Sequence, residues 1–222
     1  MATLTVYPDP DVETTTVDGY VYRQTSENWA TIIAGAGTHV NDSFATGNFA
    51  AISSDAGSNL WFRLFRSVFL FDTSALLAGA TVSAAVMSVY VNARSDALAI
   101  SPTTDVYAST PASNTSLAAA DYGQIGSTSQ TGAATAYANI TNNAYNDFTF
   151  NATGIGNVNK TGISKFGIRN ANYDVAASAP TWSSELTSAV GGMFADSAGT
   201  ANDPKLVITY TLPANTGFFL LM

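Results

Sequence analysis

The sequence contains no cysteine in its 222 residues. A disulfide scaffold, a thiolate metal site and a cysteine nucleophile are therefore excluded. Charged residues are also scarce, at 11% of the chain, where an average soluble domain has roughly 25%. Alanine, serine, threonine, asparagine and glycine take their place. A surface of hydroxyl and amide groups is well solvated but repels copies of itself weakly, which suits a protein that packs against neighbours.

Positive charge is especially rare. The chain has 8 lysines and arginines against 16 acidic residues, for a formal net charge of −8. A nucleic-acid-binding protein neutralises phosphates with a basic patch, and none is visible, so the composition argues against nucleic acid as a partner. An anionic membrane surface is disfavoured for the same reason.

Long apolar runs are missing as well. No stretch approaches the roughly 20 apolar residues that a membrane-spanning helix needs. The segment Met1–Pro10 lacks the basic and apolar regions of a signal peptide. We therefore expect a protein that is made in a host cytoplasm and does not enter a membrane, with the alternative that an export signal has been removed.

The chain has instead the pattern of a β protein. Leu60–Asp72 is a long aromatic and β-branched run, Thr81–Asn92 is a second strand-like run, and in Pro204–Thr211 the residues alternate in polarity. Trp29–Ile33 also indicates a strand, because it is rich in aromatic and β-branched residues. Helical periodicity is almost absent.

These runs predict one all-β domain, a jelly-roll β-sandwich with one or two short helical turns. The turns are expected at residues 116–122 and 151–162, where alanines, a serine cap and a terminal glycine favour helix. The sandwich is expected to span residues 1–213, with residues 1–18 as a candidate N-terminal arm.

The run Leu60–Asp72 contains two arginines. Arg63 and Arg66 lie an odd number of positions apart, so an unbulged strand places them on opposite faces. A strand that carries apolar and charged side chains on both faces indicates a two-layer architecture. We expect its aromatic residues to fill the core.

An apolar C-terminal tail follows the last strand. Exposed, residues 214–222 would be an aggregation liability, so we expect them to be buried against this protomer or against another one. The candidate residues for self-association and docking are Phe218, Phe219, Leu220, Leu221 and Met222.

The strand–turn–strand unit Arg66–Val91 has a recognisable order of residues. Its first strand ends in Phe71-Asp72, its turn contains Leu77-Ala78-Gly79-Ala80, and its second strand carries Met87-x-Val89-Tyr90. The final strand, Asp203–Tyr210, adds a second motif. Together they resemble the DNRLRE-type β-sandwich family, whose turn has Leu-Pro where this chain has Leu-Ala and whose second strand has Leu-x-Leu-Tyr.

The resemblance implies a jelly roll similar to carbohydrate-binding modules. Such domains occur attached to polysaccharide-degrading enzymes, in bacterial surface proteins and in phage or virus structural proteins. Because one fold hosts several roles, the resemblance does not choose among them. A short chain without signal peptide or catalytic domain is most similar to a virion component.

Catalytic groups are few. The only histidine is His39, in a Gly-rich segment, and no Gly-x-Ser-x-Gly elbow supports a serine nucleophile. A solvent-exposed histidine is the expected reading. A carboxylate pair for glycoside cleavage can be drawn from the acids, but most of them stand singly near turns, where Asp serves local hydrogen bonding. We expect a protein that is not an enzyme.

The densest acidic cluster lies near the N-terminus. Alternate carboxylates in a loop can converge on Ca²⁺, although no EF-hand loop is present and the neighbouring prolines suggest a solvated arm instead. No other cofactor is indicated. The candidate calcium ligands are Asp9, Asp11, Glu13 and Asp18.

Sugar binding would use exposed aromatic rings. The alternative for each ring is core packing, because large aromatics on strands are usually buried. Trp182 lies in a polar, Pro-containing loop and is therefore the first candidate. The candidates are Trp182, Tyr173, Trp29 and Trp61.

Asp72 also has two interpretations. It could ligate a metal, or it could cap the turn that begins with Thr73-Ser74. An Asp at a strand end followed by such residues favours the cap.

The leading hypothesis is a non-enzymatic virion structural protein, such as a capsid decoration or head-fibre subunit of a tailed phage. It would self-associate, as a trimer, and dock on a capsid or other virion protein at the particle surface. The first alternative is a carbohydrate-binding module or phage adhesin that recognises a host polysaccharide. The second is a bacterial extracellular matrix or filament subunit.

Overall fold

The computed structural model describes residues 1–213, and strands dominate its regular structure. The strands are β1 (Ala2–Val6), β2 (Asp18–Glu27), β3 (His39–Asn41), β4 (Thr46–Ser54), β5 (Trp61–Asp72), β6 (Thr81–Asp96), β7 (Thr103–Ser109), β8 (Ile125–Ser129), β9 (Thr135–Ala136), β10 (Ala144–Thr149), β11 (Ile163–Asn170), β12 (Thr187–Met193) and β13 (Lys205–Thr211). The helical segments are α1 (Trp29–Ala34), η1 (Ser74–Leu76), η2 (Ala119–Gln124), η3 (Tyr137–Asn139), α2 (Ala152–Gly156) and η4 (Ala171–Val175). None of the helices in residues 1–213 has the length and apolar character that crossing a membrane requires.

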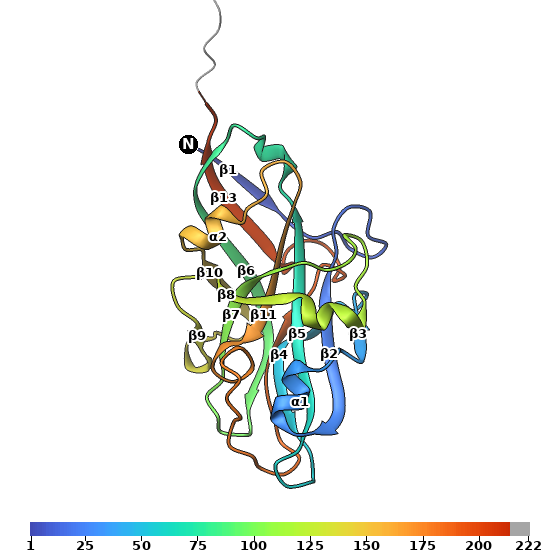
Figure 1. The fold of residues 1–222 in the computed structure, drawn as a ribbon. Helices are drawn as coiled ribbons and strands as arrows, with labels where there is room; N and C mark the ends of the chain where they lie inside the picture. The colour runs from blue at the N-terminus through green and yellow to red at the C-terminus, as the bar shows by residue number, and fades with distance from the viewer. Residues whose placement is uncertain (214–222) are drawn as a thin grey trace, which may run out of the picture.

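The strands form one antiparallel sheet that folds over into two layers (Figure 1). Its main path runs β1-β13-β6-β12-β4-β5-β11-β7-β8. The two longest strands each take two partners in succession along one edge: β5 pairs with β4 and then β11, and β6 pairs with β13 and then β12. Because β4 and β12 pair with each other, the layers are continuous. The predicted all-β jelly-roll sandwich is confirmed.

β5 is buried on both faces because its side chains alternate between two apolar clusters. Phe69 lies in one cluster, and Leu64 and Val68 lie in the other. The pairing with β2 runs without a shift from Phe69 to Arg63. Alternation therefore places Arg66 on the side of Leu64 and Val68, and Arg63 on the opposite side, as predicted.

The first cluster fills the sandwich and is called the sandwich core. The rings of Phe49, Phe69 and Phe194 pack there with centroids 5.3, 5.7 and 5.7 Å apart. Such ring pairs stabilise by about 0.5–1.5 kcal/mol each beyond their burial. The buried members are Phe49, Ala50, Phe69, Phe71, Leu76, Ala80, Ala85, Met87, Val89, Val91, Val106, Ile140, Phe148, Phe150, Val158, Phe166, Ile168, Val190, Phe194, Leu206 and Ile208.

The other cluster lies on the outer face of the β5 layer and is called the second core. It is covered by α1, η2 and loops, so this face of the sheet is hidden from solvent (Figure 1). Its buried members are Val17, Val21, Trp29, Ile32, Ile52, Trp61, Leu64, Val68, Leu70, Leu98, Ile100, Tyr107, Leu117, Tyr122 and Ile125.

The strand predicted at residues 29–33 is wrong, because the segment forms the helix α1. The Asn28 side chain accepts a hydrogen bond from Thr31 N at 3.0 Å and so caps the helix N-terminus. Trp29 and Ile32, three positions apart, both face the second core. A spacing of three suits a helical face, and the cap together with this burial outweighs the β-propensity of the run.

The two predicted helical turns are confirmed, with shifted bounds. The first forms as η2, three residues later than expected, and the second as α2. The Asn151 side chain caps α2 by accepting from Gly154 N at 3.0 Å. Both segments are one or two turns long, as their few helix-favouring residues predict.

Residues 1–18 do not form a free arm, which corrects that prediction. β1 pairs with β13 along its whole length, from Ala2 to Val6. Thr16, Val17 and Asp18 are buried where β2 begins. The prolines at positions 8 and 10 therefore interrupt a chain that rejoins the sheet. The predicted tail, residues 214–222, lies outside the described residues.

Candidate functional sites at the two ends of the sandwich

One end of the sandwich, called the terminal end, brings the start and finish of the described chain together. β1 begins beside the end of β13, because Ala2 pairs with Tyr210. The turn from β5 to β6 lies at the same end, since Thr81 pairs with Thr211. Figure 1 shows these elements together at the top of the molecule.

The terminal end exposes large apolar side chains. Met1 is 96% exposed, Leu77 58% and Leu212 54%. These three are half of the exposed large apolar side chains that residues 1–213 contain. Single exposed apolar residues are ordinary on a protein surface, but a group at one end indicates an interaction surface.

Leu77 is held in an unusual backbone conformation. Its φ of 67° and ψ of 151° lie in a region that is essentially reserved for glycine, at a cost of about 1–3 kcal/mol. The turn around it is fixed on both sides: Asp72 Oδ1 accepts from Ser74 N at 3.0 Å, and Lys160 Nζ donates to Ala80 O at 3.0 Å. The expected capping role of Asp72 is confirmed. The turn thus presents the Leu77 side chain to solvent.

Residues of the tail were also predicted from the sequence to mediate self-association. Phe218, Phe219, Leu220, Leu221 and Met222 lie outside the described residues. The described chain reaches them through Pro213, whose Cγ lies 3.1 Å from the position that a Cβ on Gly79 would take. The described part of the chain therefore finishes at the terminal end.

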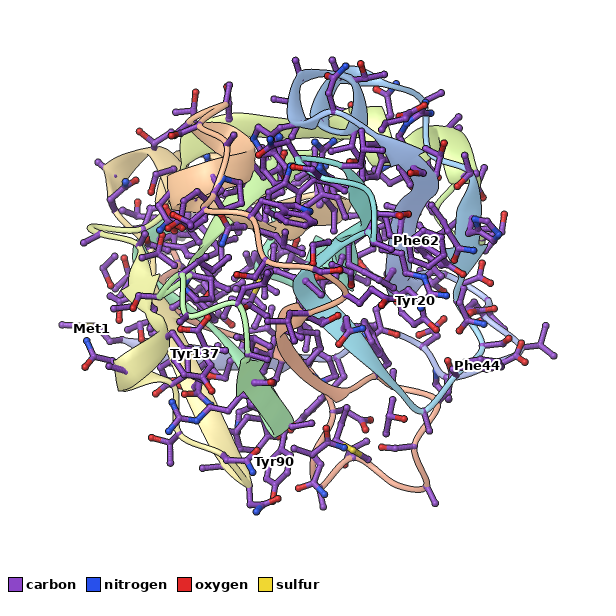
Figure 2. The ribbon with its side chains drawn as sticks, turned by 90° about the horizontal axis from the view of Figure 1, so that it is seen from below. Met1, Tyr20, Phe44, Phe62, Tyr90 and Tyr137 are labelled. Carbon is purple, nitrogen blue, oxygen red and sulfur yellow. The ribbon has the colours of Figure 1, made fainter. Side chains whose placement is uncertain are left out.

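The opposite end, called the distal end, carries a polar groove of about 300 Å3. It lies between the β4–β5 hairpin and the loop that leads into β12. Figure 2 looks at this end of the molecule and labels Phe62, one of the lining residues. The lining residues are Ser53, Ser54, Asp55, Ala56, Phe62, Arg63, Glu185 and Thr187.

A β-bulge shapes the groove. Ser53 pairs with Arg63 and Ser54 pairs with Trp61, so Phe62 is an extra residue on β5. A bulge turns side chains away from the regular alternation, and bulges are frequent beside functional sites. Here Trp61 enters the second core, whereas Phe62 and Arg63 line the groove.

Arg63 is oriented by two contacts. Its Nε donates to Gln24 Oε1 at 2.7 Å, and its Cζ lies 4.8 Å from the centroid of the Phe62 ring. Neither Arg63 nor Phe62 was among the site residues predicted from the sequence. An arginine next to a phenylalanine in a strand gives a weak signal for such a site, because it provides a charged donor beside an apolar ring.

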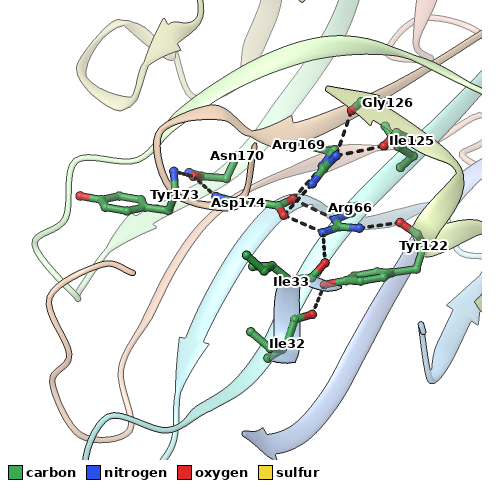
Figure 3. A network of polar contacts seen from close by, with 10 residues as sticks. All are labelled: Ile32, Ile33, Arg66, Tyr122, Ile125, Gly126, Arg169, Asn170, Tyr173 and Asp174. Atoms are coloured by element: carbon green, nitrogen blue, oxygen red, sulfur yellow. Dashed lines mark hydrogen bonds and ion pairs between the residues drawn. The ribbon is translucent and has the colours of Figure 1, made fainter. Parts of the chain in front are cut away.

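A second polar cluster lies inside the second core (Figure 3). The Asp174 carboxylate accepts two hydrogen bonds from Arg66, at 2.8 and 2.6 Å, and two from Arg169, at 2.9 and 2.8 Å. The Asn170 side chain accepts from Tyr173 N and Asp174 N, which fixes the start of η4. The side chains of Arg66, Arg169 and Asp174 are all buried or nearly so.

Backbone carbonyls complete this cluster. Arg66 donates to Tyr122 O and Ile33 O, and Arg169 donates to Ile125 O and Gly126 O. Burial alone would raise the pKa of the Asp174 carboxyl, but the hydrogen bonds and charges of Arg169 and Arg66 lower it. The cluster ties α1, η2, β8 and η4 to the sheet. Its polar groups are directed at one another, so its role is to hold the cover of the second core.

Two of the sugar-binding candidates are core residues, which corrects that expectation. Trp29 and Trp61 meet edge to face in the second core, with ring centroids 5.0 Å apart and an angle of 72°. They are only 5% and 2% exposed. Neither ring can stack on a sugar, because both are buried.

The other two candidates are half-buried and also pack against the second core. Trp182 Nε1 donates to Leu60 O at 3.1 Å, and Tyr173 Oη donates to Ile100 O at 2.6 Å. Each of these bonds fastens a loop to a neighbouring segment. Neither residue lines the polar groove.

The four calcium candidates do not converge. Asp9 Oδ2 accepts from Thr14 N at 3.1 Å and from Thr14 Oγ1 at 2.9 Å, so it organises its own loop. Asp18 instead points into the protein and accepts from Ala195 N. Within residues 1–213, no three His, Cys, Asp or Glu side chains are arranged to hold a metal ion. The four residues are Asp9, Asp11, Glu13 and Asp18.

Asp18 carries the largest electrostatic perturbation of this region. Burial raises the pKa of its carboxyl well above the usual range, and the hydrogen bond from Ala195 N only partly opposes this. The negative charges of Asp196 and Asp203 raise the pKa further. Among residues 1–213, no cation forms an ion pair with Asp18, which lies at the start of β2.

His39 lies on the surface of the edge strand β3. Its ring stacks on Tyr22 at a centroid distance of 4.7 Å, and Tyr22 in turn stacks on Phe65 at 4.4 Å. Nδ1 lies 2.8 Å from Thr38 Oγ1. The expected exposure of His39 is confirmed, although it lies in a strand.

No protein-family model matches this chain, and no curated protein matches it. The likeness to the DNRLRE-type family therefore rests on the motifs in the sequence.

Proposed function

We propose that this protein is a non-enzymatic structural protein of a virion, such as a capsid decoration or head-fibre subunit of a tailed phage. It self-associates, as a trimer, through the terminal end of the sandwich. The assembled unit then docks on a protein lattice at the particle surface.

The group of exposed apolar residues at the terminal end carries this proposal. Met1, Leu77 and Leu212 face solvent there, and the sequence after residue 213 ends in five apolar residues. A second copy of the chain offers the same apolar surface, and a symmetric assembly buries it without any other partner. We therefore take a second copy as the occupant of this surface.

The composition supports the same reading. Only 11% of the residues are charged, and two of the few cations, Arg66 and Arg169, are buried. The surface is therefore dominated by small polar residues, which allow close approach of copies. The fixed turn around Leu77 adds a preorganised contact, which lowers the entropy lost on association.

The first prediction concerns residues 214–222. A chain that ends at residue 213 should sediment as a monomer at concentrations where the full chain is an oligomer, because apolar contact area is lost. Leu77→Asp should weaken association in the same way, since it places a charge in the contact. Analytical ultracentrifugation over a range of concentrations measures both effects.

Phe44→Asp is the matched control for Leu77→Asp. Phe44 is also 58% exposed, but it lies in the loop between β3 and β4, away from the terminal end. Oligomers that persist in the truncated chain, or that Phe44→Asp disrupts equally, would contradict the proposal. Growth into open filaments with rising concentration would instead favour the matrix or filament subunit.

The second prediction concerns the genetic setting. The reading frames beside the gene should encode capsid or tail proteins, because virion components are encoded together. Neighbouring frames that encode an export system or polysaccharide-degrading enzymes would contradict the virion role. They would not bear on self-association, which the sedimentation experiment tests separately.

A further inference from the structure

The groove at the distal end has the features of a small-molecule site. Its volume of about 300 Å3 matches the lower end of the range that such sites occupy, about 300–1,000 Å3. Ser53, Phe62, Arg63 and Thr187 are held on the strands β4, β5 and β12, which position groups more accurately than loops do, and Asp55 and Glu185 come from loops that adjoin these strands. The bulge at Phe62 brings an aromatic ring to the polar lining.

The groove combines donors with acceptors. Within residues 1–213, the only hydrogen bond of the Arg63 guanidinium is that of Nε to Gln24, so its terminal nitrogens face the groove without a protein acceptor. Asp55 and Glu185 provide carboxylates, and no ion pair within 4.0 Å joins them to Arg63. Asp55 Oδ1 accepts from Gly57 N at 3.1 Å, so the groups left for a ligand are the other Asp55 oxygen, the Glu185 carboxylate and the terminal nitrogens of Arg63.

Hydroxyl groups and backbone geometry add to the lining. Thr187 Oγ1 donates to Ser53 Oγ at 2.9 Å, which orients both hydroxyls. Glu185 adopts a φ of 54°, a conformation that non-glycine residues rarely take. Strained residues of this kind gather at ligand sites, where they aim a side chain.

The charge pattern selects the class of ligand. An anion would meet Asp55 and Glu185, and a cation would meet Arg63. An apolar ligand would leave these polar groups without partners. A neutral sugar avoids all three penalties, because each hydroxyl both donates and accepts and because the C–H face of a pyranose can pack on the Phe62 ring.

We propose that the groove lined by Ser53, Asp55, Phe62, Arg63, Glu185 and Thr187 binds a neutral oligosaccharide. Arg63 donates to ring or hydroxyl oxygens, and Glu185 and Asp55 accept from hydroxyls. This site involves different residues from self-association at the terminal end and lies at the opposite end of the sandwich. None of the rings selected from the sequence for sugar binding belongs to it.

Isothermal titration calorimetry with cellohexaose, maltohexaose, mannohexaose and N-acetylchitohexaose tests this site. At least one of these probes should bind the full chain with a dissociation constant of about 1 mM or tighter. Arg63→Gln and Glu185→Gln should each weaken that binding by about tenfold or more, because each removes a charge-assisted hydrogen bond. Circular dichroism should show unchanged secondary structure in both variants.

Arg94→Gln is the matched control. Arg94 also lies over an aromatic ring, that of Tyr137, with the same 4.8 Å from Cζ to centroid, but it does not line the groove. Its replacement should leave the affinity unchanged. Failure of all four probes to bind would overturn the proposal, as would binding that survives both groove variants. Loss of binding only in Trp182→Phe would also overturn it, because that ring packs on the second core.

Discussion

An aspartate is buried on each face of the β5 layer, and the surroundings shift the pKa values of the two carboxyl groups in opposite directions. Asp174 lies in the second core and is held by Arg66 and Arg169. Asp18 lies at the rim of the sandwich core, where its hydrogen-bond partner is Ala195 N and no cation pairs with it among residues 1–213. The pKa of Asp174 is lowered, whereas that of Asp18 is raised.

This difference follows from how each core is closed. The sandwich core is enclosed by two layers of one sheet, so packing of apolar side chains is enough to define it. The second core is closed by α1, η2, η4 and loops, which have few strand hydrogen bonds to fix them. Directional contacts from Arg66 and Arg169 fix these segments instead, and Asp174 compensates the charge.

The largest effect is expected from Asp174→Ala. It leaves two buried guanidinium groups without their carboxylate, and loss of one partner from a buried ion pair costs about 3–5 kcal/mol. Because a domain of ordinary stability has about 5–15 kcal/mol, the variant should be close to unfolding. The free energy of unfolding from urea denaturation measures the loss.

Two further variants keep this experiment decisive. Asp174→Asn retains one acceptor oxygen and should lose less stability, which keeps a folded species available for measurement. Glu27→Gln breaks the partly exposed ion pair with Arg23 and should change stability by about 1 kcal/mol or less. Equal losses in Asp174→Ala and Glu27→Gln would show that the buried cluster does not hold the second core.

A smaller effect is expected in the sandwich core from Phe69→Leu. The ring of Phe69 stacks on Phe194 and meets Phe49 at an edge, but a leucine preserves much of the volume. Hydrophobic exchanges of similar volume usually cost less than about 1.5 kcal/mol. A loss of the size expected for Asp174→Ala would mean that both cores depend equally on specific contacts.

The fold could be predicted to the extent that local pattern determines it. Long runs of aromatic and β-branched residues identified β5, β6 and β13, and the odd spacing of Arg63 and Arg66 placed them on opposite faces. The helix α1 was missed because Trp29–Ile33 has strand-like composition and the cap at Asn28 was overlooked. β4 was indistinct, since much of it consists of glycine, alanine, serine and asparagine.

The candidate sites were harder to predict, because their residues come from distant parts of the chain. Arg66 and Asp174 are separated by 108 positions, and no local pattern joins them. The distal groove similarly combines Ser53, Arg63 and Glu185. Four aromatic residues were predicted as sugar-binding candidates because exposed rings can stack on sugars, but the residue type does not indicate whether a ring faces the core or the solvent.

At acid pH the smallest effect is expected from Asp18→Asn, and this effect grows as the pH rises. A carboxyl whose pKa is raised by folding contributes stability below its unfolded pKa, about 3.9, and loses that contribution as the pH rises through the folded pKa. Wild type and Asp18→Asn should therefore differ little at acid pH, where Asp18 is protonated. The variant should gain stability relative to wild type as the pH rises, because the amide stays neutral.

Asp174→Asn supplies the opposite slope. The lowered pKa of Asp174 means that its contribution is present above the unfolded pKa and is lost as the pH falls through the folded pKa, so the deficit of this variant should shrink toward acid pH. Urea denaturation at several values between about pH 3 and about pH 8 measures both trends. If the stability difference from wild type changes with pH in the same direction for both variants, then the arginines do not cause the pKa values of the two carboxyl groups to differ. The contrast between the two cores would then fail.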